Sequence, residues 1–350
     1  MERMQVCFGY RTAFQILREI DAEKLGWANG GTRGLPARAP SMADLEEVIR
    51  RIESEHPCLS IERPAHILLG TSSRCRVSSQ RTPHVCTTEL RGRSILRLSD
   101  TVGVCGAPFS YVQMAPQAED IADLLELGYE VCGTYMTKRT SSTSAYQAAP
   151  LASVRALRDF AARNPSLNGA RVVASAIPYL ADGSASPRET KQALVLGLPH
   201  ARGGYGLGIP RMNYEVRASP AARALTGKSF FRCDLCWPEA KLDVEYQSRW
   251  AHEGEAKRLE DSRRTNALAA MGWKVVCITN DELDSLAATD AIANTIRRHL
   301  GKRAQVRVPD HHARKLRLRR QLGLPVGYER TTTRTGGVGR GSALSGCLEP

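Results

Sequence analysis

Residues 230–247 read Phe-Phe-Arg-Cys-Asp-Leu-Cys-Trp-Pro-Glu-Ala-Lys-Leu-Asp-Val-Glu-Tyr-Gln, and apolar and polar positions alternate from residue 242 onward. Successive side chains of a β-strand point to opposite faces of a sheet. The apolar residues 242, 244 and 246 therefore share one face, whereas Asp243, Glu245 and Gln247 share the other. The stretch predicts a β-hairpin with its turn at residues 238–241 and an acidic face on its second strand.

The length of the turn decides whether Asp234, on the first strand, joins the acidic face. A turn centred between Glu239 and Ala240 places Asp234 opposite Glu245, with Cβ atoms roughly 5 Å apart. Two carboxylates that close repel each other unless a cation lies between them, and hard oxygen ligands suit Mg²⁺. A register that differs by one residue would turn Asp234 into the core, where an ionised carboxylate is unfavourable. A solvated strand face would show the same alternation, so the pattern also has a purely structural explanation.

The segments around the hairpin predict a small α/β domain. A helix is expected over 187–198, after the break at Asp182-Gly-Ser-Ala-Ser-Pro. A long helix over 253–271, a strand over 273–278 and a helix over 281–300 follow the hairpin. The order helix, strand, strand, helix, strand, helix indicates a mixed sheet flanked by helices.

Residues 1–183 predict an α+β accessory region of one or two domains. Helices are expected over 5–25, after an N-cap at Ser41, and over 118–127, 151–162 and 170–180. Short strands are expected at 66–69, 93–98 and 109–114.

The composition indicates a basic globular protein. The chain has 350 residues, 42% of them hydrophobic, and a net charge of +13. Residues 302–350 hold eleven Lys and Arg against three acids, and so contribute +8 of that charge. This segment, which includes Arg317, Arg319 and Arg320, is predicted to be disordered and to contact nucleic-acid phosphates.

The remaining patterns favour a cytoplasmic protein that does not enter a membrane. No apolar run approaches the roughly 18 residues that span a bilayer, and the N-terminus does not resemble a signal peptide. The ten cysteines are scattered, which is typical of reduced thiols. Cys233 and Cys236 have CxxC spacing, but residues three apart in a strand face opposite sides, so no zinc site is expected there.

A family resemblance adds to this reading. The run Arg232-Cys-Asp-Leu-Cys-Trp-Pro-Glu-Ala-Lys-Leu-Asp-Val-Glu-Tyr, then Asp261-x-x-Arg264 and Gly272-Trp-Lys-Val, resembles small endonuclease-like domains related to very-short-patch-repair endonucleases. These domains belong to the PD-(D/E)xK restriction-endonuclease superfamily. The resemblance covers about residues 184–300 and implies a restriction-endonuclease-like mixed sheet flanked by helices.

The resemblance implies that Asp234 and Glu245 bind Mg²⁺ or Mn²⁺. The metal would polarise the scissile phosphate and lower the pKa of a bound water. Gln247 occupies the third motif position, where a Lys or an acid is usual; a Gln can orient a water but cannot act as a base. Lys241 is an even number of residues away from Asp243 and Glu245. If it lies within the strand, its side chain would therefore face the same side and could substitute for the missing base.

Glu189 is the third candidate metal ligand. In the superfamily the first core helix often donates an acid, and Ser186-Pro-Arg-Glu189 begins that helix here. The same Ser-x-x-Glu spacing is a capping box with Pro at the first helical position, which explains Glu189 without a metal. Both readings stay open.

Three further residues are candidate DNA contacts. Arg249 and His252 follow the second strand, where they would either approach a phosphate or form a surface turn. Arg264 would contact DNA or pair with Asp261, three residues away on the same helix face.

Two functions are therefore expected as alternatives. The first is a metal-dependent DNA endonuclease-like protein that hydrolyses phosphodiester bonds. The second is an inactive nuclease fold that acts as a DNA-binding regulator, because the upstream half faintly resembles regulators of abortive-infection toxin–antitoxin systems. The sequence gives no indication of oligomeric state.

Overall fold

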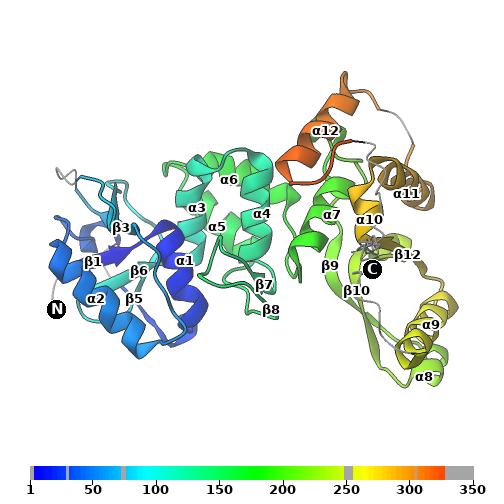
Figure 1. Cartoon of the computed structure of the whole chain (residues 1–350), viewed down its shortest axis with the longest axis horizontal. Helices are drawn as coiled ribbons and strands as arrows, with labels where there is room; N and C mark the ends of the chain where they lie inside the picture. The colour runs from blue at the N-terminus through cyan, green and yellow to red at the C-terminus, as the bar shows by residue number, and fades with distance from the viewer. Residues whose placement is uncertain (1–3, 29–30, 72–75, 248–254, 304–305, 328–350) are drawn as a thin grey trace, which may run out of the picture.

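The computed structural model describes residues 4–28, 31–71, 76–247, 255–303 and 306–327 (Figure 1). The fold is mixed α/β, as expected, and contains two multistranded sheets with helices against them. Among the described residues, no helix combines the length and apolar character needed to cross a bilayer.

The N-terminal sheet is mixed and has the strand order β2-β5-β6-β1-β3-β4. Strand β1 (Val6–Phe8) is parallel to β6 (Val102–Cys105) and antiparallel to β3 (Ala65–Leu69). The other strands and the two helices of this part are β2 (Gly26–Trp27), β4 (Arg81–Val85), β5 (Ile95–Arg97), α1 (Tyr10–Glu19) and α2 (Met42–Glu55).

Two predictions in this half of the chain are wrong, whereas the strands expected at 66–69 and 93–98 and the cap at Ser41 are confirmed. Residues 5–25 are not one helix, because Val6–Phe8 is a strand buried on both faces whose continuous apolar run also fits a helix. Residues 109–114 lie in helix α3 (Ala107–Met114), which is buried on nearly all sides and so lacks a helical stripe. The cap at Ser41 is present, since its Oγ accepts a hydrogen bond of 3.1 Å from Asp44 N in a capping box.

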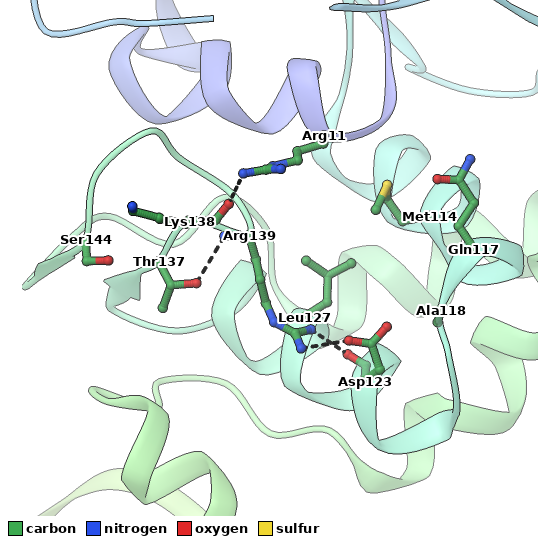
Figure 2. A pocket seen from close by; sticks show the side chains of 10 residues that line it. All are labelled: Arg11, Met114, Gln117, Ala118, Asp123, Leu127, Thr137, Lys138, Arg139 and Ser144. Carbon is green, nitrogen blue, oxygen red and sulfur yellow. Dashed lines mark hydrogen bonds and ion pairs between the residues drawn. The ribbon is translucent and has the colours of Figure 1, made fainter. Parts of the chain in front are cut away.

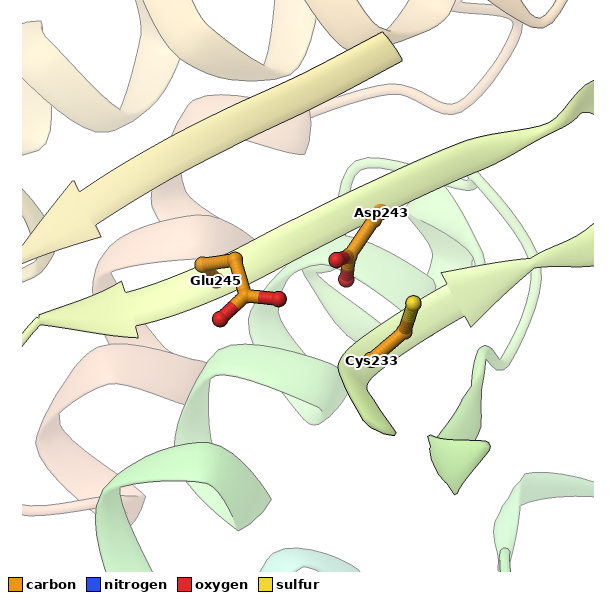
Figure 3. Close-up of side chains that lie close together, drawn as sticks. All are labelled: Cys233, Asp243 and Glu245. Atoms are coloured by element: carbon orange, nitrogen blue, oxygen red, sulfur yellow. The ribbon is translucent and has the colours of Figure 1, made fainter. Parts of the chain in front are cut away.

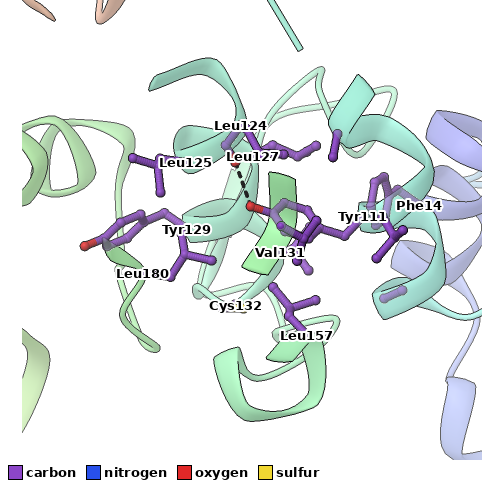
Figure 4. Packing of buried hydrophobic residues seen from close by; sticks show 14 of the residues in the cluster. Phe14, Tyr111, Leu124, Leu125, Leu127, Tyr129, Val131, Cys132, Leu157 and Leu180 are labelled. Carbon is purple, nitrogen blue, oxygen red and sulfur yellow. Dashed lines mark hydrogen bonds between the residues drawn. The ribbon is translucent and has the colours of Figure 1, made fainter. Parts of the chain in front are cut away.

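A helical layer lies between the two sheets (Figure 1). It consists of α3, α4 (Ile121–Val131), α5 (Val154–Arg163) and α6 (Ala170–Ala176). Figure 4 shows its packing, in which Tyr111 is fully buried and its hydroxyl donates a 3.0 Å hydrogen bond to Leu124 O. This bond satisfies the one polar atom of the Tyr111 side chain, so the ring can be enclosed without an unpaired donor. A short hairpin, β7 (Tyr135–Met136) with β8 (Ala145–Tyr146), lies at the edge of this layer.

The C-terminal sheet has the order β12-β11-β10-β9. The predicted hairpin is β10 (Phe230–Trp237) with β11 (Leu242–Gln247), and β12 (Lys274–Thr279) runs parallel to β11. The predicted helices are α7 (Pro187–Gly197), α9 (Glu255–Ala270), and the pair α10 (Asn280–Asp284) and α11 (Leu286–His299).

Strand β9 (Arg211–Arg217) and helix α8 (Pro220–Thr226) were not predicted. The last predicted helix, over 281–300, is interrupted at Ser285, whose side chain caps α11 by accepting from Ala288 N.

The prediction of a disordered segment after residue 301 is wrong for its described part. Helix α12 (His311–Gln321) packs on the body of the protein. Leu318 and Leu322 lie in the main core, and the buried Arg319 donates to Leu283 O at 2.9 Å and to Asp284 O at 2.6 Å. The high density of basic residues hides these few apolar anchors from a composition argument.

Two apolar cores cover the two faces of the C-terminal sheet. The main core continues from the N-terminal sheet through the helical layer and α7 to Leu235 and Val244. A second core lies between the sheet and helices α8 and α9; it contains Val216, Ala218, Ala222, Phe231, Cys233, Cys236, Ala267 and Leu268. Each strand residue of the hairpin can therefore be assigned to a face by the core that it joins.

Candidate metal centre

The register of the hairpin is the predicted one. Leu235 pairs with Val244, Cys236 with Asp243 and Trp237 with Leu242, as expected for a turn centred between residues 239 and 240. Continuing this register by one position places Asp234 opposite Glu245. The predicted position of the turn is thus confirmed, and the pairing of Asp234 with Glu245 would be the next step of this ladder.

The alternation of side chains, however, breaks at Asp234. Cys233 and Cys236 both belong to the second core, although they are three residues apart. Next to Asp234, on β9, Asn213 has a φ of 48°, a left-handed conformation that is unusual within a strand. The two strands are therefore kinked together, and the expectation that the two cysteines face opposite sides is wrong.

At this kink the Asp234 carboxylate is held by the backbone of the neighbouring strand. Its Oδ2 accepts a 2.9 Å hydrogen bond from Tyr246 N. Burial, and then the charge of Glu245, raise the pKa of Asp234 to about 6. The side chain is thus close enough to Glu245 for the two charges to repel each other.

Glu189 combines the two roles that the sequence left open. Ser186 Oγ accepts a 3.1 Å bond from Glu189 N and so caps α7. The Glu189 carboxylate accepts from Ala185 N at 3.0 Å and from Asn213 Nδ2 at 2.8 Å. Burial, and then the charge of Asp234, raise the pKa of Glu189 above its usual range. A capping glutamate therefore lies within electrostatic reach of Asp234.

Asp243 is the site residue whose importance the sequence did not show. It had been placed on an open, acidic face, yet its side chain is fully buried against the second core. Figure 3 shows Asp243 and Glu245 on β11 directed toward Cys233 on β10. One potential ligand atom from each of the three residues lies within 4.8 Å of the others, and they form the one such group among the described residues.

One cation accompanies these acids. Arg264 on α9 has its Nη2 2.5 Å from Glu245 Oε1 and 3.5 Å from Asp243 Oδ2. Burial raises the pKa of Asp243 to about 7. Burial and the adjacent Asp243 raise that of Glu245 to about 8, so the single guanidinium does not balance the buried carboxyls.

The donor set fits a bound divalent cation. Asp243 Oδ1 and Oδ2 are buried acceptor oxygens that no N–H group bonds, and Glu245 Oε1 has the ion pair with Arg264 as its one contact with a cation among the described residues. Buried carboxylates are normally hydrogen-bonded, paired or coordinated to a metal. A cation at this position would supply the missing positive charge.

The structure does not place the other catalytic candidates at the acids. Lys241 lies before β11 in a left-handed turn, with a φ of 47°, and its Nζ donates to Met271 O at 3.1 Å. It cannot replace the missing base, since it is outside the strand. Gln247 is exposed at the last position of β11. Arg249 and His252 lie outside the described residues.

Two of the predicted DNA contacts are engaged elsewhere. Arg264 is committed to Glu245 and also donates to Arg232 O at 2.6 Å, rather than to Asp261 or to solvent. Arg319 is only 2% exposed and binds backbone carbonyls, so it cannot reach a phosphate. Arg317 and Arg320, in contrast, are exposed on α12.

A separate cavity lies in the N-terminal half. It has a volume of about 550 Å³ and is bounded by α1, α3, α4 and the loop 137–144 (Figure 2). Arg11 and Arg139 on its wall are paired with Glu62 and Asp123, each at 2.7 Å. The buried Glu130 fixes the loop by accepting from Thr137 N at 2.7 Å. The cavity shares no residue with the acidic cluster.

Comparisons with known proteins give no activity. Two uncharacterized proteins of Mycobacterium tuberculosis, from strains CDC 1551 / Oshkosh and ATCC 25618 / H37Rv, are each 30% identical to the chain over 126 residues. The match covers 36% of this chain and 41% of each relative, so the chain spans about two fifths of their length. No protein-family model matches the chain, and no solved structure matches it significantly.

Proposed function

We propose that the chain is a metal-dependent DNA endonuclease-like protein that hydrolyses phosphodiester bonds. The observation that carries the proposal is the Asp234 carboxylate, which Tyr246 N on the adjacent strand bonds at 2.9 Å and which lies within electrostatic reach of both Glu245 and Glu189. The order α7, β9, α8, β10, β11, α9, β12 forms a mixed sheet flanked by helices, as the resemblance of residues 184–300 to restriction-endonuclease-like domains implies.

In this proposal Asp234, Glu245 and Glu189 would hold Mg²⁺ or Mn²⁺. The ion, when bound, would polarise a phosphate and lower the pKa of a water. Tyr246 N and Asn213 Nδ2 orient the carboxylates of Asp234 and Glu189, respectively. Gln247 lies two residues after Glu245 and can orient a water without accepting its proton.

A second candidate is a nuclease fold without activity that binds DNA as a regulator. Gln247 in place of the usual Lys or acid favours it, and so does the ion pair that occupies Glu245. DNA contacts would come from exposed basic residues such as Arg317 and Arg320, which attract phosphates without reading sequence. For both candidate functions we propose a cytoplasmic location. The eight described cysteines are all free, which accords with a reducing compartment.

The decisive assay is the nicking of supercoiled plasmid in the presence of Mg²⁺ or Mn²⁺. Wild type is compared with Asp234→Ala and with Glu239→Gln, which removes an exposed acid from the same hairpin. The proposal expects nicking by wild type and Glu239→Gln and none by Asp234→Ala. Equal, negligible nicking by all three, together with retained DNA binding, would leave only the regulator.

A further inference from the structure

The cluster formed by Cys233, Asp243 and Glu245 differs chemically from a magnesium site. Cys233 and Asp243 are fully buried, and the side chain of Glu245 is 18% exposed. The kink at Asp234 brings Cys233 to the α9 side of the sheet, where it packs in the core with Ala267 and Leu268. Figure 3 shows the two β11 acids directed toward Cys233. A thiol and two carboxyls thus converge, with ligand atoms within 4.8 Å of one another.

The surroundings of the Asp243 carboxyl indicate that a cation binds in this cluster. Its carboxylate oxygens accept no hydrogen bond from outside the cluster, where Glu245 and Cys233 are the neighbouring partners, and its nearest cationic group among the described residues, Arg264 Nη2, is 3.5 Å from Oδ2. Arg264 makes its close contact with Glu245 instead, and it also donates to Arg232 O. The fully enclosed carboxyl therefore faces another acid and a thiol, and no donor from the rest of the described protein bonds it.

We propose that Cys233, Asp243 and Glu245 form a binding site for a thiophilic divalent ion, Zn²⁺. Zn²⁺ takes Cys sulfur and carboxylate oxygen together, whereas Mg²⁺ is bound by oxygen ligands. Three protein ligands leave one tetrahedral position for a water. On binding, the Cys233 thiol loses its proton to solvent, and the ion replaces the Arg264 guanidinium as the main counter-charge of Glu245.

The inference deepens the proposed function, because Glu245 belongs to both sites. The Zn²⁺ site does not require Asp234 or Glu189, which are the other ligands of the proposed Mg²⁺ or Mn²⁺ site. The two proposals can therefore fail separately.

The test uses the full chain after removal of metal with EDTA, titrated with Co²⁺ as a coloured substitute for Zn²⁺. One equivalent should give a thiolate-to-Co²⁺ charge-transfer band and intense d–d bands, and both should be displaced by Zn²⁺. Cys233→Ser should abolish the charge-transfer band. Asp243→Asn should lower the affinity at least about 100-fold, since outer-shell partners alone are worth 10–100-fold.

Three further variants sharpen the outcome. Cys58→Ser removes an exposed thiol and should leave the spectrum unchanged. Arg264→Gln should raise the affinity for Co²⁺ by roughly tenfold, because it removes a competing positive charge near the site. Asp234→Ala should retain the spectrum even where it abolishes nicking. Circular dichroism of each variant shows whether it is folded.

Two results would overturn the proposal: a wild type without a thiolate band, or a band that survives in Cys233→Ser. A normal Co²⁺ spectrum in a wild type that never nicks DNA would refute the nuclease proposal alone.

Discussion

The buried acid Asp243 should make the protein less stable as the pH rises, and Asp243→Asn should remove much of this effect. Its pKa of about 7 in the folded protein lies above the ordinary value of 3.8. As the pH rises, Asp243 in the folded protein therefore keeps its proton up to a higher pH than Asp243 in the unfolded chain. The resulting stabilisation is fully present below about pH 4 and is lost as the pH rises through about 7.

The magnitude follows from the size of the shift. A difference of about three units between the pKa of Asp243 in the folded and the unfolded state corresponds to about 4 kcal/mol of unfolding free energy. This figure is an upper limit, because Asp243 and Glu245 titrate together. Asp243→Asn should therefore be more stable than wild type by up to about 4 kcal/mol at pH 8 to 9. Near pH 4 the two proteins should differ by about 1 kcal/mol or less, since Asp243 is then protonated in the fold.

Urea unfolding at a series of pH values, in EDTA so that no metal neutralises the carboxyls, measures this difference. The control is Glu239→Gln, whose removed acid lies in the same hairpin but is 78% exposed, and its curve should run parallel to that of wild type. If the curve of unfolding free energy against pH for Asp243→Asn also runs parallel to that of wild type from pH 4 to 9, ionisation of Asp243 does not destabilise the folded protein. The account of an uncompensated acidic cluster would then be wrong.

Three other predictions concern the rest of the chain. Leu318→Ala, in the core contact of α12, should lower the unfolding free energy by about 2–5 kcal/mol in urea unfolding; a change below about 0.5 kcal/mol would mean that α12 does not pack. Glu130→Ala should destabilise the protein by about 1–3 kcal/mol and speed amide exchange at Thr137, whose N–H loses its acceptor; unchanged exchange would contradict that role. Replacing both Arg317 and Arg320 with Ala should weaken DNA binding and reduce the slope of log affinity against log salt by about 2, and an unchanged slope would show that these residues make no phosphate contact.

The sequence predicted the hairpin of the site well, because register depends on turn length and strand parity. Both can be counted from residues 230–247, and the pairing of Leu235 with Val244 confirms the count. The cap at Ser186 was predictable for a similar reason, since it needs only a local spacing. Local rules therefore located the backbone of the candidate site.

The directions of the side chains could not be predicted in the same way. Asp243 has the sequence context of a solvated strand residue, and only helix α9, packed on that face through Ala267 and Leu268, buries it. The loss of alternation at Asp234 likewise depends on β9, a strand that was not recognised. Its seven residues include Asn213 and two charged arginines, which conceal a strand pattern.

Asn213 links these separate features and explains why the candidate site is more than a pair of acids. Its left-handed backbone kinks β9 beside Asp234, and its side-chain amide donates to both Gly183 O, at 2.9 Å, and Glu189 Oε2, at 2.8 Å. One residue therefore joins the kinked strand pair to the first turn of α7. The same kink turns Cys233 toward Asp243, so the positions of the two candidate metal sites depend on a single distortion of the sheet.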